Sequence, residues 1–177
     1  MKPKLFLHVC CAVCAAAMVD LLKDKFEIVL FYYNPNTYPE EEYQKRKESV
    51  VELAKIYNVE FLEGEYDKEI WFEKVKGLEK EPEGGKRCLV CFKNRLQRTA
   101  LLAKENYFTT TLSLSPYKNE KEINKIGKKI PQKFLTLEDL DLNKKEVWQR
   151  TRELSKKYNL YHQKYCGCIF STVDNSS

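Results

Sequence analysis

The sequence predicts a single α/β domain, built on a doubly wound parallel sheet of about five strands with helices on both faces. Short apolar or β-branched runs alternate with segments whose apolar residues recur every three or four positions, as in helices that pack on a sheet. The chain has 177 residues, which is near the usual size of one domain, and 43% of them are hydrophobic, which suffices for one core. No internal repeat interrupts this alternation.

The first half of the chain is predicted to contain three strands, over residues 4–9, 28–33 and 59–62. A cysteine-rich turn follows the first strand and leads into an alanine- and leucine-rich helix, apolar nearly all round, that ends near Leu22. Pro39 opens the next helix, and a helix carrying Trp71 follows Asp67. The order so far is strand, helix, strand, helix, strand, helix.

The second half continues the pattern. A helix begins near Cys88, after a Pro- and Gly-containing break. The side-chain pattern then changes to a repeat of two residues, with threonine and serine between mostly larger side chains, which predicts a fourth strand over 108–114. A helix with isoleucines at 123, 126 and 130 follows, then a fifth strand over 134–137 and a last helix over 147–158. Residues 1–171 are therefore predicted to form the domain, and 172–177 a polar tail that frays.

Strands that alternate with helices imply right-handed crossovers and a Rossmann-like arrangement. In such sheets the binding site lies beyond the carboxyl ends of the strands, where the strand order reverses. The cysteine-rich turn after the first strand falls at that edge. We therefore expect the chemistry of the protein there.

Charge is distributed unevenly along the chain. Residues 118–164 contain 13 Lys and Arg against 7 Asp and Glu, so this segment carries a net charge of +6 and the remainder about −1. Such a segment attracts a phosphate backbone, although a solvated helix face is the alternative interpretation. No apolar stretch approaches the roughly 18 residues that a membrane helix needs, and no cleavable signal peptide is seen, so we expect a cytoplasmic protein with no membrane partner.

The seven cysteines occur in three clusters. Buried structural thiols usually occur singly along apolar faces, and a secreted disulfide scaffold would need a signal peptide. A metal centre or a redox-active dithiol therefore explains the clustering better. The clusters are Cys10, Cys11 and Cys14; Cys88 and Cys91; and Cys166 and Cys168.

The spacing within the clusters favours iron–sulfur over zinc. Structural zinc sites typically use four ligands in paired C-x-x-C knuckles, but here one pair is adjacent and another is separated by a single glycine. Seven thiols also exceed one tetrahedral site by three. Thiolate-rich sites suit iron–sulfur clusters, for which four cysteines hold the cluster while others bind a second metal or cycle as a disulfide.

Two further residues have open roles. His8 lies two residues before Cys10 on the same strand face, where it is either a ligand, a donor that tunes the centre or a hydrogen-bonded structural histidine. Asp67 is either a helix N-cap or an oxygen ligand of a separate iron.

Five segments of the chain carry a further signal: HVCCAVC (8–14), FYYNPN (31–36), RCLVCF (87–92), TTLSLSPYK (110–118) and YHQKYCGC (161–168). Together they resemble the cobalamin-independent epoxyqueuosine reductases of the QueH family. The resemblance runs from about residue 5 to 171 and includes all seven cysteines. Val13 and His162 depart from the family pattern, which has proline and arginine there, and the second departure affects a possible phosphate or base contact.

The resemblance implies an oxidoreductase that performs the last step of queuosine biosynthesis in tRNA. The implied reaction is a two-electron deoxygenation of the epoxide on epoxyqueuosine in the anticodon loop. The implied cofactors are a [4Fe-4S] cluster and an additional mononuclear iron, with an electron donor still to be identified. This chemistry agrees with the residues, because an epoxide oxygen needs a Lewis acid and a nearby source of electrons.

We assign Cys10, Cys11, Cys88 and Cys91 to the cluster, because the first turn and the start of the CxxC helix can approach one another at the strand ends. Cys14, Cys166 and Cys168 remain for catalysis. The Cys166-Gly167-Cys168 segment either binds the additional iron or forms a redox-active disulfide.

An anticodon loop is recognised by stacking of splayed bases on aromatic or guanidinium planes and by basic contacts to phosphates. Core packing explains some of the suitable side chains equally well. The expected tRNA contacts are Tyr117, Lys118, Trp148, Arg150, Arg152, Tyr161 and His162.

Two other function classes share features with this sequence. An iron–sulfur tRNA-thiolating enzyme that uses ATP could share the fold, but its first turn would need a Gly- and Ser-rich pyrophosphate loop, and here that turn contains no glycine. A non-catalytic, zinc-stabilised nucleic-acid-binding module is the other alternative, and it predicts a colourless protein.

Overall fold

The computed structural model describes residues 1–173, and its centre is a five-stranded sheet in which all neighbouring strands are parallel. The strand order is β3-β2-β1-β4-β5. The predicted doubly wound α/β class is confirmed. The strands are β1 (Lys4–His8), β2 (Glu27–Tyr32), β3 (Glu60–Glu63), β4 (Tyr107–Thr110) and β5 (Lys133–Phe134).

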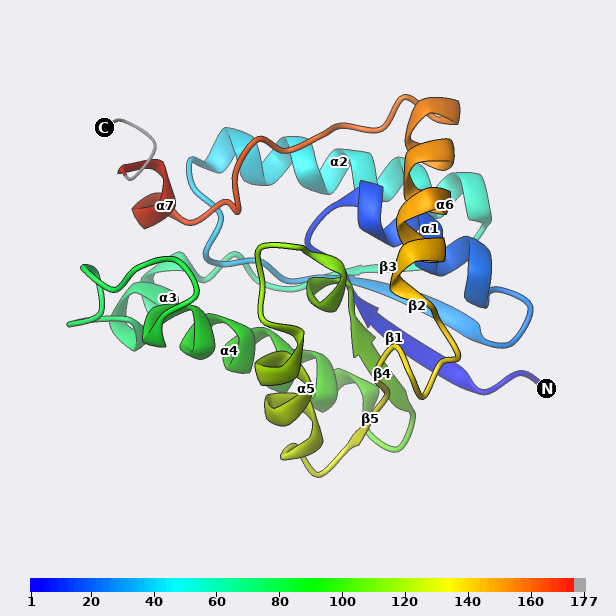
Figure 1. The fold of residues 1–177 in the computed structure, drawn as a ribbon, viewed down its shortest axis with the longest axis horizontal. Helices are drawn as coiled ribbons and strands as arrows, with labels where there is room; N and C mark the ends of the chain where they lie inside the picture. Colours follow the sequence, from blue (N-terminus) through cyan, green and yellow to red (C-terminus); the bar gives the residue numbers. More distant parts are fainter. Residues whose placement is uncertain (174–177) are drawn as a thin grey trace.

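Helices form a layer on each face of the sheet (Figure 1). One layer contains α1 (Ala12–Leu22), α2 (Glu40–Tyr57) and α6 (Lys144–Lys157). The other contains α4 (Lys86–Ala103) and α5 (Glu120–Lys128), with α3 (Lys68–Lys74) beside the start of α4. After α6 the chain passes along α2 and ends in α7 (Ile169–Val173), at the same end of the molecule as α3.

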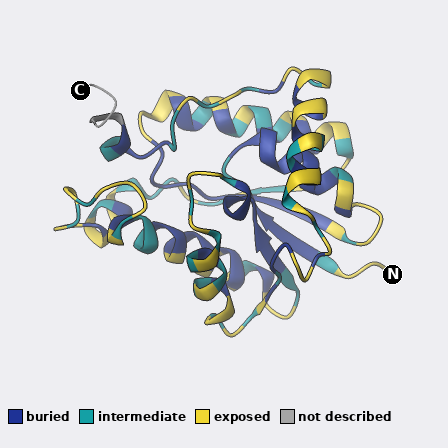
Figure 2. Cartoon of the chain, viewed as in Figure 1, coloured by how far each residue is buried: buried dark blue, intermediate teal, exposed yellow. Residues whose placement is uncertain are grey.

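The core has two main parts, one on each face of the sheet. In Figure 2 most of the central strands and parts of the helices that cover them are coloured as buried. Helix α1 is buried on almost every side because α2 and α6 both pack against it, which agrees with its apolar sequence. A small third cluster joins Trp71 and Val75 to Cys91 and Cys168. No helix within residues 1–173 is long and apolar enough to cross a membrane.

The predicted fourth strand is wrong beyond residue 110. β4 ends at Thr110, and Thr111–Leu114 form a 3₁₀ helix, η1. The Thr110 side chain accepts a hydrogen bond from the Leu112 backbone N–H. It therefore caps η1 at the point where the β-sheet hydrogen bonds of β4 would otherwise continue. All four η1 residues are buried. The alternation of leucine with threonine and serine therefore does not mark two faces of a strand.

Two further differences from the prediction concern the fifth strand and the C-terminal segment. The fifth strand covers only Lys133–Phe134, because the Asp139 carboxylate accepts hydrogen bonds from the backbone and side chain of Thr136 and turns the chain. Helix α7 was not predicted, and it runs past the expected domain boundary at residue 171. Residues 174–177 of the predicted polar tail lie outside the described residues.

Candidate functional site

The strand order reverses between β1 and β4, so the loops that follow these two strands diverge. Cys10 and Cys11 follow β1, and η1 follows β4. The Cys10 backbone N–H donates to Thr111 Oγ1 at 3.3 Å, which fixes the two loops to each other. The first cysteine cluster therefore lies at the predicted edge of the sheet.

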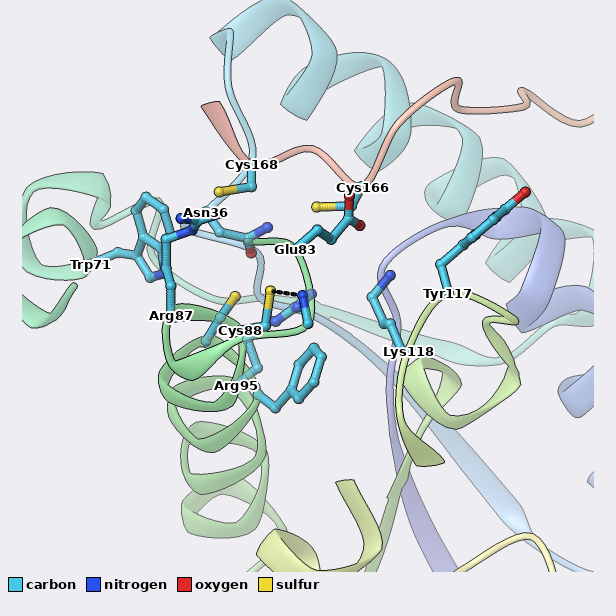
Figure 3. Close-up of a pocket in the computed structure, with 13 residues that line it drawn as sticks. Asn36, Trp71, Glu83, Arg87, Cys88, Arg95, Tyr117, Lys118, Cys166 and Cys168 are labelled. Atoms are coloured by element: carbon cyan, nitrogen blue, oxygen red, sulfur yellow. Dashed lines mark hydrogen bonds between the residues drawn. The ribbon is translucent and has the colours of Figure 1, made fainter. Parts of the chain in front are cut away.

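All seven cysteines line two adjoining cavities at this edge. The inner cavity, of about 20 Å³, is lined by Cys88, Cys91, Cys166 and Cys168 together with buried polar residues (Figure 3). The outer cavity, of about 680 Å³, is lined by Cys10, Cys11, Cys14 and again Cys166. Lys118 also lines both cavities. Three segments that are far apart in the sequence thus contribute thiols to one region.

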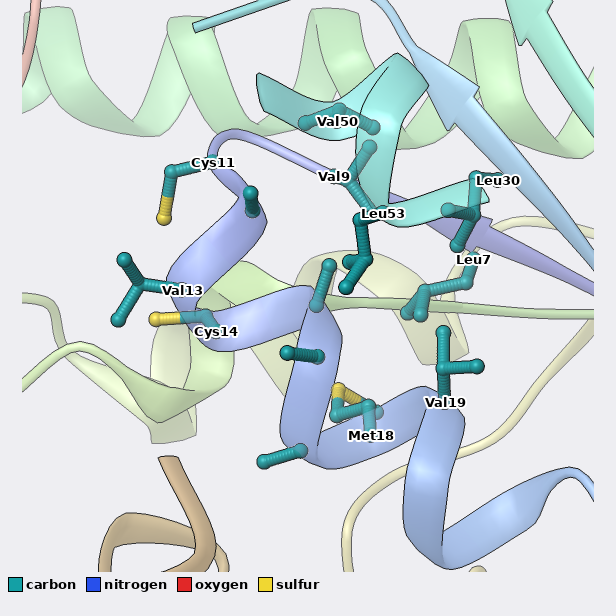
Figure 4. Close-up of a cluster of buried hydrophobic side chains, with 14 of the residues drawn as sticks. Leu7, Val9, Cys11, Val13, Cys14, Met18, Val19, Leu30, Val50 and Leu53 are labelled. Carbon is teal, nitrogen blue, oxygen red and sulfur yellow. The ribbon is translucent and has the colours of Figure 1, made fainter. Parts of the chain in front are cut away.

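The first segment places its thiols at the start of α1. Cys10 Sγ lies 3.9 Å from Cys11 Sγ, and the thiols of Cys11 and Cys14 point to the same side of α1, away from the leucines of the core (Figure 4). The contact with Cys11 and burial raise the pKa of the Cys10 thiol. The contact with Cys10 lowers the pKa of Cys11, but the contact with Cys14 and burial outweigh it and raise the pKa to about 12.

The second segment is the N-terminal part of α4. Cys88 and Cys91 are three residues apart on this helix and therefore lie on the same side of it. The Gly84 backbone N–H donates to Cys88 Sγ at 3.2 Å. Burial raises the pKa of the Cys91 thiol, although nearby Arg95 opposes the shift. The positive end of the helix dipole also favours anionic sulfur here.

The third segment is held in place by α2. Arg46 donates from Nη1 to the Cys166 carbonyl at 3.1 Å and from Nη2 to the Tyr165 carbonyl at 3.0 Å. Its Nε donates to the Glu42 carboxylate at 2.7 Å, and both side chains are buried. Gly167 has φ of +101°, and a Cβ there would lie 2.9 Å from Arg46 Nη1. Glycine is therefore required for the chain to pass so close to the guanidinium.

Four of the thiols have raised pKa values and are therefore protonated near neutral pH when no metal is bound. Burial and the neighbouring Cys166 raise the pKa of Cys168 to about 11, and the pKa values of Cys10, Cys11 and Cys91 are also raised. A metal that binds these sulfurs must displace their protons and supply positive charge.

His8 is a structural histidine. Its Nε2–H donates to the Tyr33 carbonyl at 3.0 Å, and its Nδ1 accepts from the Thr110 hydroxyl at 2.9 Å, since Thr110 Oγ1 already accepts the Leu112 N–H. Both ring nitrogens are used. Burial, with nearby Arg95, lowers its pKa to about 3, so the ring is neutral. Of the three open roles, the structure supports the structural one.

The structure does not bring Asp67 to the thiols. It occupies the N-cap position of α3 without a side-chain capping bond, and its carboxylate accepts from the Tyr33 hydroxyl at 3.0 and 3.2 Å. It lines a separate groove with Lys74 and Asn94 and neither cysteine cavity. The predicted role as an iron ligand therefore has no support in the geometry.

The residues predicted to contact tRNA divide into two groups. Arg150 forms an ion pair with Asp20 at 2.7 Å, and the Tyr161 hydroxyl donates to Glu42 at 2.6 Å, so both support the fold outside the two cavities. Trp148 is oriented by a 3.0 Å hydrogen bond from Nε1 to the Leu114 carbonyl. Of the residues predicted to contact tRNA, five line the outer cavity: Tyr117, Lys118, Trp148, Arg152 and His162.

Four buried polar residues of the inner cavity were missed by the sequence prediction. Each has a side-chain atom without a hydrogen-bond partner: Oδ1 of Asn36, Nε1 of Trp71, and Nε of Arg87 and Arg95. Three of these atoms are N–H donors beside sulfur. The sequence signal was the spacing of Arg87, Cys91 and Arg95, which places two arginines on the cysteine-bearing side of α4.

The donor set fits a thiolate-bound cluster better than a single ion. Within the described residues, no three His, Cys, Asp or Glu side chains are arranged to hold one metal ion. The four cysteines of a [4Fe-4S] cluster bind different irons, so they need not converge on one point. The unpartnered N–H groups fit the sulfurs of such a group. The two cavities group the thiols differently from the predicted cluster set, which stays a prediction.

A family profile described as epoxyqueuosine reductase QueH matches residues 5–174 of the chain. A relative from Acinetobacter baylyi of the same name is 39% identical over 98% of this chain and 82% of its own length. The relative from Haemophilus influenzae is 36% identical over 98% and 73% of the two chains. The relative from Thermotoga maritima is 38% identical over 95% and 90%.

Among solved structures, the chain is similar to the U34-tRNA thiolase NcsA of Methanococcus maripaludis with its [4Fe-4S] cluster. The TM-score is 0.44 and the sequence identity 11%, over 88% of this chain and 67% of the thiolase.

Replacing the residue that holds the third cysteine segment tests the geometry of the site. Arg46→Met removes two bonds to the segment and leaves buried Glu42 without its cation, so the free energy of unfolding of the metal-free protein should fall by about 3–5 kcal/mol. Urea denaturation measures this change. Exposed Arg152→Met is the matched control and should change it by less than about 0.5 kcal/mol. Equal stability of the two variants would contradict the described role of Arg46.

Proposed function

The chain belongs to the epoxyqueuosine reductase QueH family and is an oxidoreductase, and on that basis we propose that it reduces epoxyqueuosine in tRNA to queuosine. The observation that carries the proposal is the gathering of all seven cysteines at two adjoining cavities. The outer cavity also contains aromatic and basic side chains, so a centre rich in sulfur and a surface suited to a nucleotide meet at one place.

The proposed reaction removes one oxygen atom from the substrate. Two electrons and two protons enter, both C–O bonds of the epoxide break, a C=C double bond forms in the cyclopentane ring, and the oxygen leaves as water. The electrons come from a donor outside this chain. A [4Fe-4S] cluster and an additional iron, when bound, supply the electrons to the substrate and a Lewis acid for its oxygen.

We assign Cys10, Cys11, Cys88 and Cys91 to the cluster. Cys14, Cys166 and Cys168 are then available for the additional iron or for a redox-active pair. Cys166 lines both cavities, which supports a role for its thiol between the cluster and the additional iron. The bonds from Arg46 and the close approach of Gly167 to its guanidinium fix this segment, and with it Cys166, relative to α2.

The outer cavity is the proposed binding place for the modified nucleoside. Its volume of about 680 Å³ suits a base and its cyclopentane substituent. Trp148 presents an indole fixed by the Leu114 carbonyl, and Tyr117 presents an exposed ring, so both can stack on bases. Lys118, Arg152 and His162 supply the polar and cationic contacts to phosphates and base edges.

Turnover of epoxyqueuosine-containing tRNA tests the proposed function. Protein reconstituted with iron and sulfide without oxygen, and supplied with a chemical reductant, should convert epoxyqueuosine to queuosine, seen by mass spectrometry as loss of one oxygen atom. Cys88→Ser should lower the rate by at least about 100-fold, because it removes a cluster ligand. Ile56→Ala, exposed on α2 and outside both cavities, is the control. An assembled wild-type centre that leaves the epoxide unchanged would refute the proposal.

The contacts of the outer cavity predict a difference between two neighbouring arginines of α6. Arg152→Ala should weaken tRNA binding and reduce the slope of log affinity against log salt by about 1, because one phosphate contact is lost. Lys118→Ala should do the same. Arg150→Ala should leave the slope unchanged, since Arg150 is paired with Asp20. Filter binding at several salt concentrations measures the slopes, and equal effects of Arg150 and Arg152 would contradict the assigned surface.

A further inference from the structure

Two buried arginines of the inner cavity have no acidic partner. Arg87 is 1% exposed and Arg95 is 4% exposed. Three other arginines pair with carboxylates: Arg46 with Glu42, Arg98 with Glu65 and Arg150 with Asp20. Among residues 1–173, neither Arg87 nor Arg95 forms such an ion pair. Burying a cation without a counter-ion costs free energy. A bound anion would offset this cost for Arg87 and Arg95, and no carboxylate of the described chain does so.

Arg95 lines the inner cavity together with thiols of α4 and of the C-terminal segment, among them Cys91 and Cys166. Burial lowers the pKa of its guanidinium, but the thiols of Cys91, Cys10 and Cys166 outweigh this effect and raise it, so all three cysteine segments act on Arg95 electrostatically. One of its terminal nitrogens, Nη1, donates to Asn34 Oδ1 at 3.2 Å, and Asn34 Nδ2 donates to the Val9 carbonyl at 2.9 Å. This chain of bonds fixes the guanidinium, while its Nε–H has no partner.

Arg87 also lines the inner cavity, and hydrogen bonds hold its guanidinium in place as well. Its Nη1 donates to the carbonyls of Leu78 and Glu79 at 3.1 and 2.9 Å, and also to that of Glu81. Its guanidinium lies 5.0 Å from the centre of the Phe170 ring. Its Nε–H and the Nε1–H of neighbouring Trp71 have no partner. Figure 3 shows Trp71, Arg87 and Arg95 around the thiols of the inner cavity.

We propose that Arg95, assisted by Arg87, is the counter-charge of the metal–thiolate centre. The Arg95 guanidinium neutralises the negative charge of the group that the three cysteine segments bind, and its Nε–H donates to a sulfur of that group. This inference rests on the proposed function, because it needs a centre bound to thiolates. It adds a role for two residues that bind no metal themselves.

The proposal predicts opposite contributions of Arg95 in the two states of the protein. In the metal-free protein the buried guanidinium has no carboxylate partner among the described residues, so its burial opposes folding. In the loaded protein it faces an anionic group, so it stabilises that state. A fixed positive charge and an N–H···S hydrogen bond also favour the reduced form of a cluster, which carries one more negative charge, and so raise the reduction potential.

The test uses three variants of helix α4. Arg95→Met removes the charge but keeps a long side chain. Arg95→Lys keeps the charge but loses the planar set of N–H donors of the guanidinium. Arg98→Met is the matched control, because Arg98 is exposed and pairs with Glu65. For each protein we would measure the thermal unfolding midpoint, metal-free and iron-loaded, and the midpoint potential of the cluster without oxygen.

Arg95→Met should lose most of the gain in midpoint temperature that iron loading gives the wild type, and its cluster potential should become more negative. Arg95→Lys should keep most of the gain, and Arg98→Met should match the wild type in both measurements. An equal loss of stability by Arg95→Met in both states, with an unchanged potential, would overturn the inference while leaving the proposed function intact. A wild type that takes up no iron would overturn both.

Discussion

The reversal of strand order between β1 and β4 determines where the cysteines can meet. The chain leaves β1 toward β2 and β3, then returns to the other side of β1 as β4, so the loops after β1 and β4 diverge and leave space between them. The same edge receives the N-terminus of α4 and the segment that precedes α7. In a nucleotide-binding fold this space holds phosphate, but here thiols occupy it.

Meeting at one edge requires each segment to be fixed separately. Thr111 accepts the Cys10 backbone N–H and fixes the first loop, while α4 carries its cysteines on a rigid helix. The C-terminal segment before α7 is held by an isolated bridge between Cys168 and Thr37, where the Tyr38 N–H donates to the Gly167 carbonyl at 2.8 Å. Arg46 donates to two further carbonyls of the segment, so the buried ion pair within α2 contributes to the position of two of the seven cysteines.

The sequence was sufficient for the fold class and for the edge at which the first cysteines lie, because both follow from local patterns of apolar residues. It misplaced the end of β4, because a run of alternating leucine with threonine and serine satisfies the strand pattern, whereas the Thr110 cap that ends the strand is visible only in the structure. Arg87 and Arg95 are charged residues on a helix, which usually indicates an exposed face, and only the fold reveals that they are buried. Asp67 could be read from its residue type as either a helix N-cap or an iron ligand, and only the packing of α3 shows that it lines neither cysteine cavity.

An absorption spectrum and a metal count of the protein purified without oxygen measure the metal centre most directly. A [4Fe-4S] cluster with a separate iron predicts broad absorbance near about 400 nm and more than four irons per chain. The same purification of a variant in which Cys88 and Cys91 are both serine should lose the absorbance. A colourless wild-type protein that contains only zinc would contradict an iron–sulfur centre at the meeting point of the three cysteine segments.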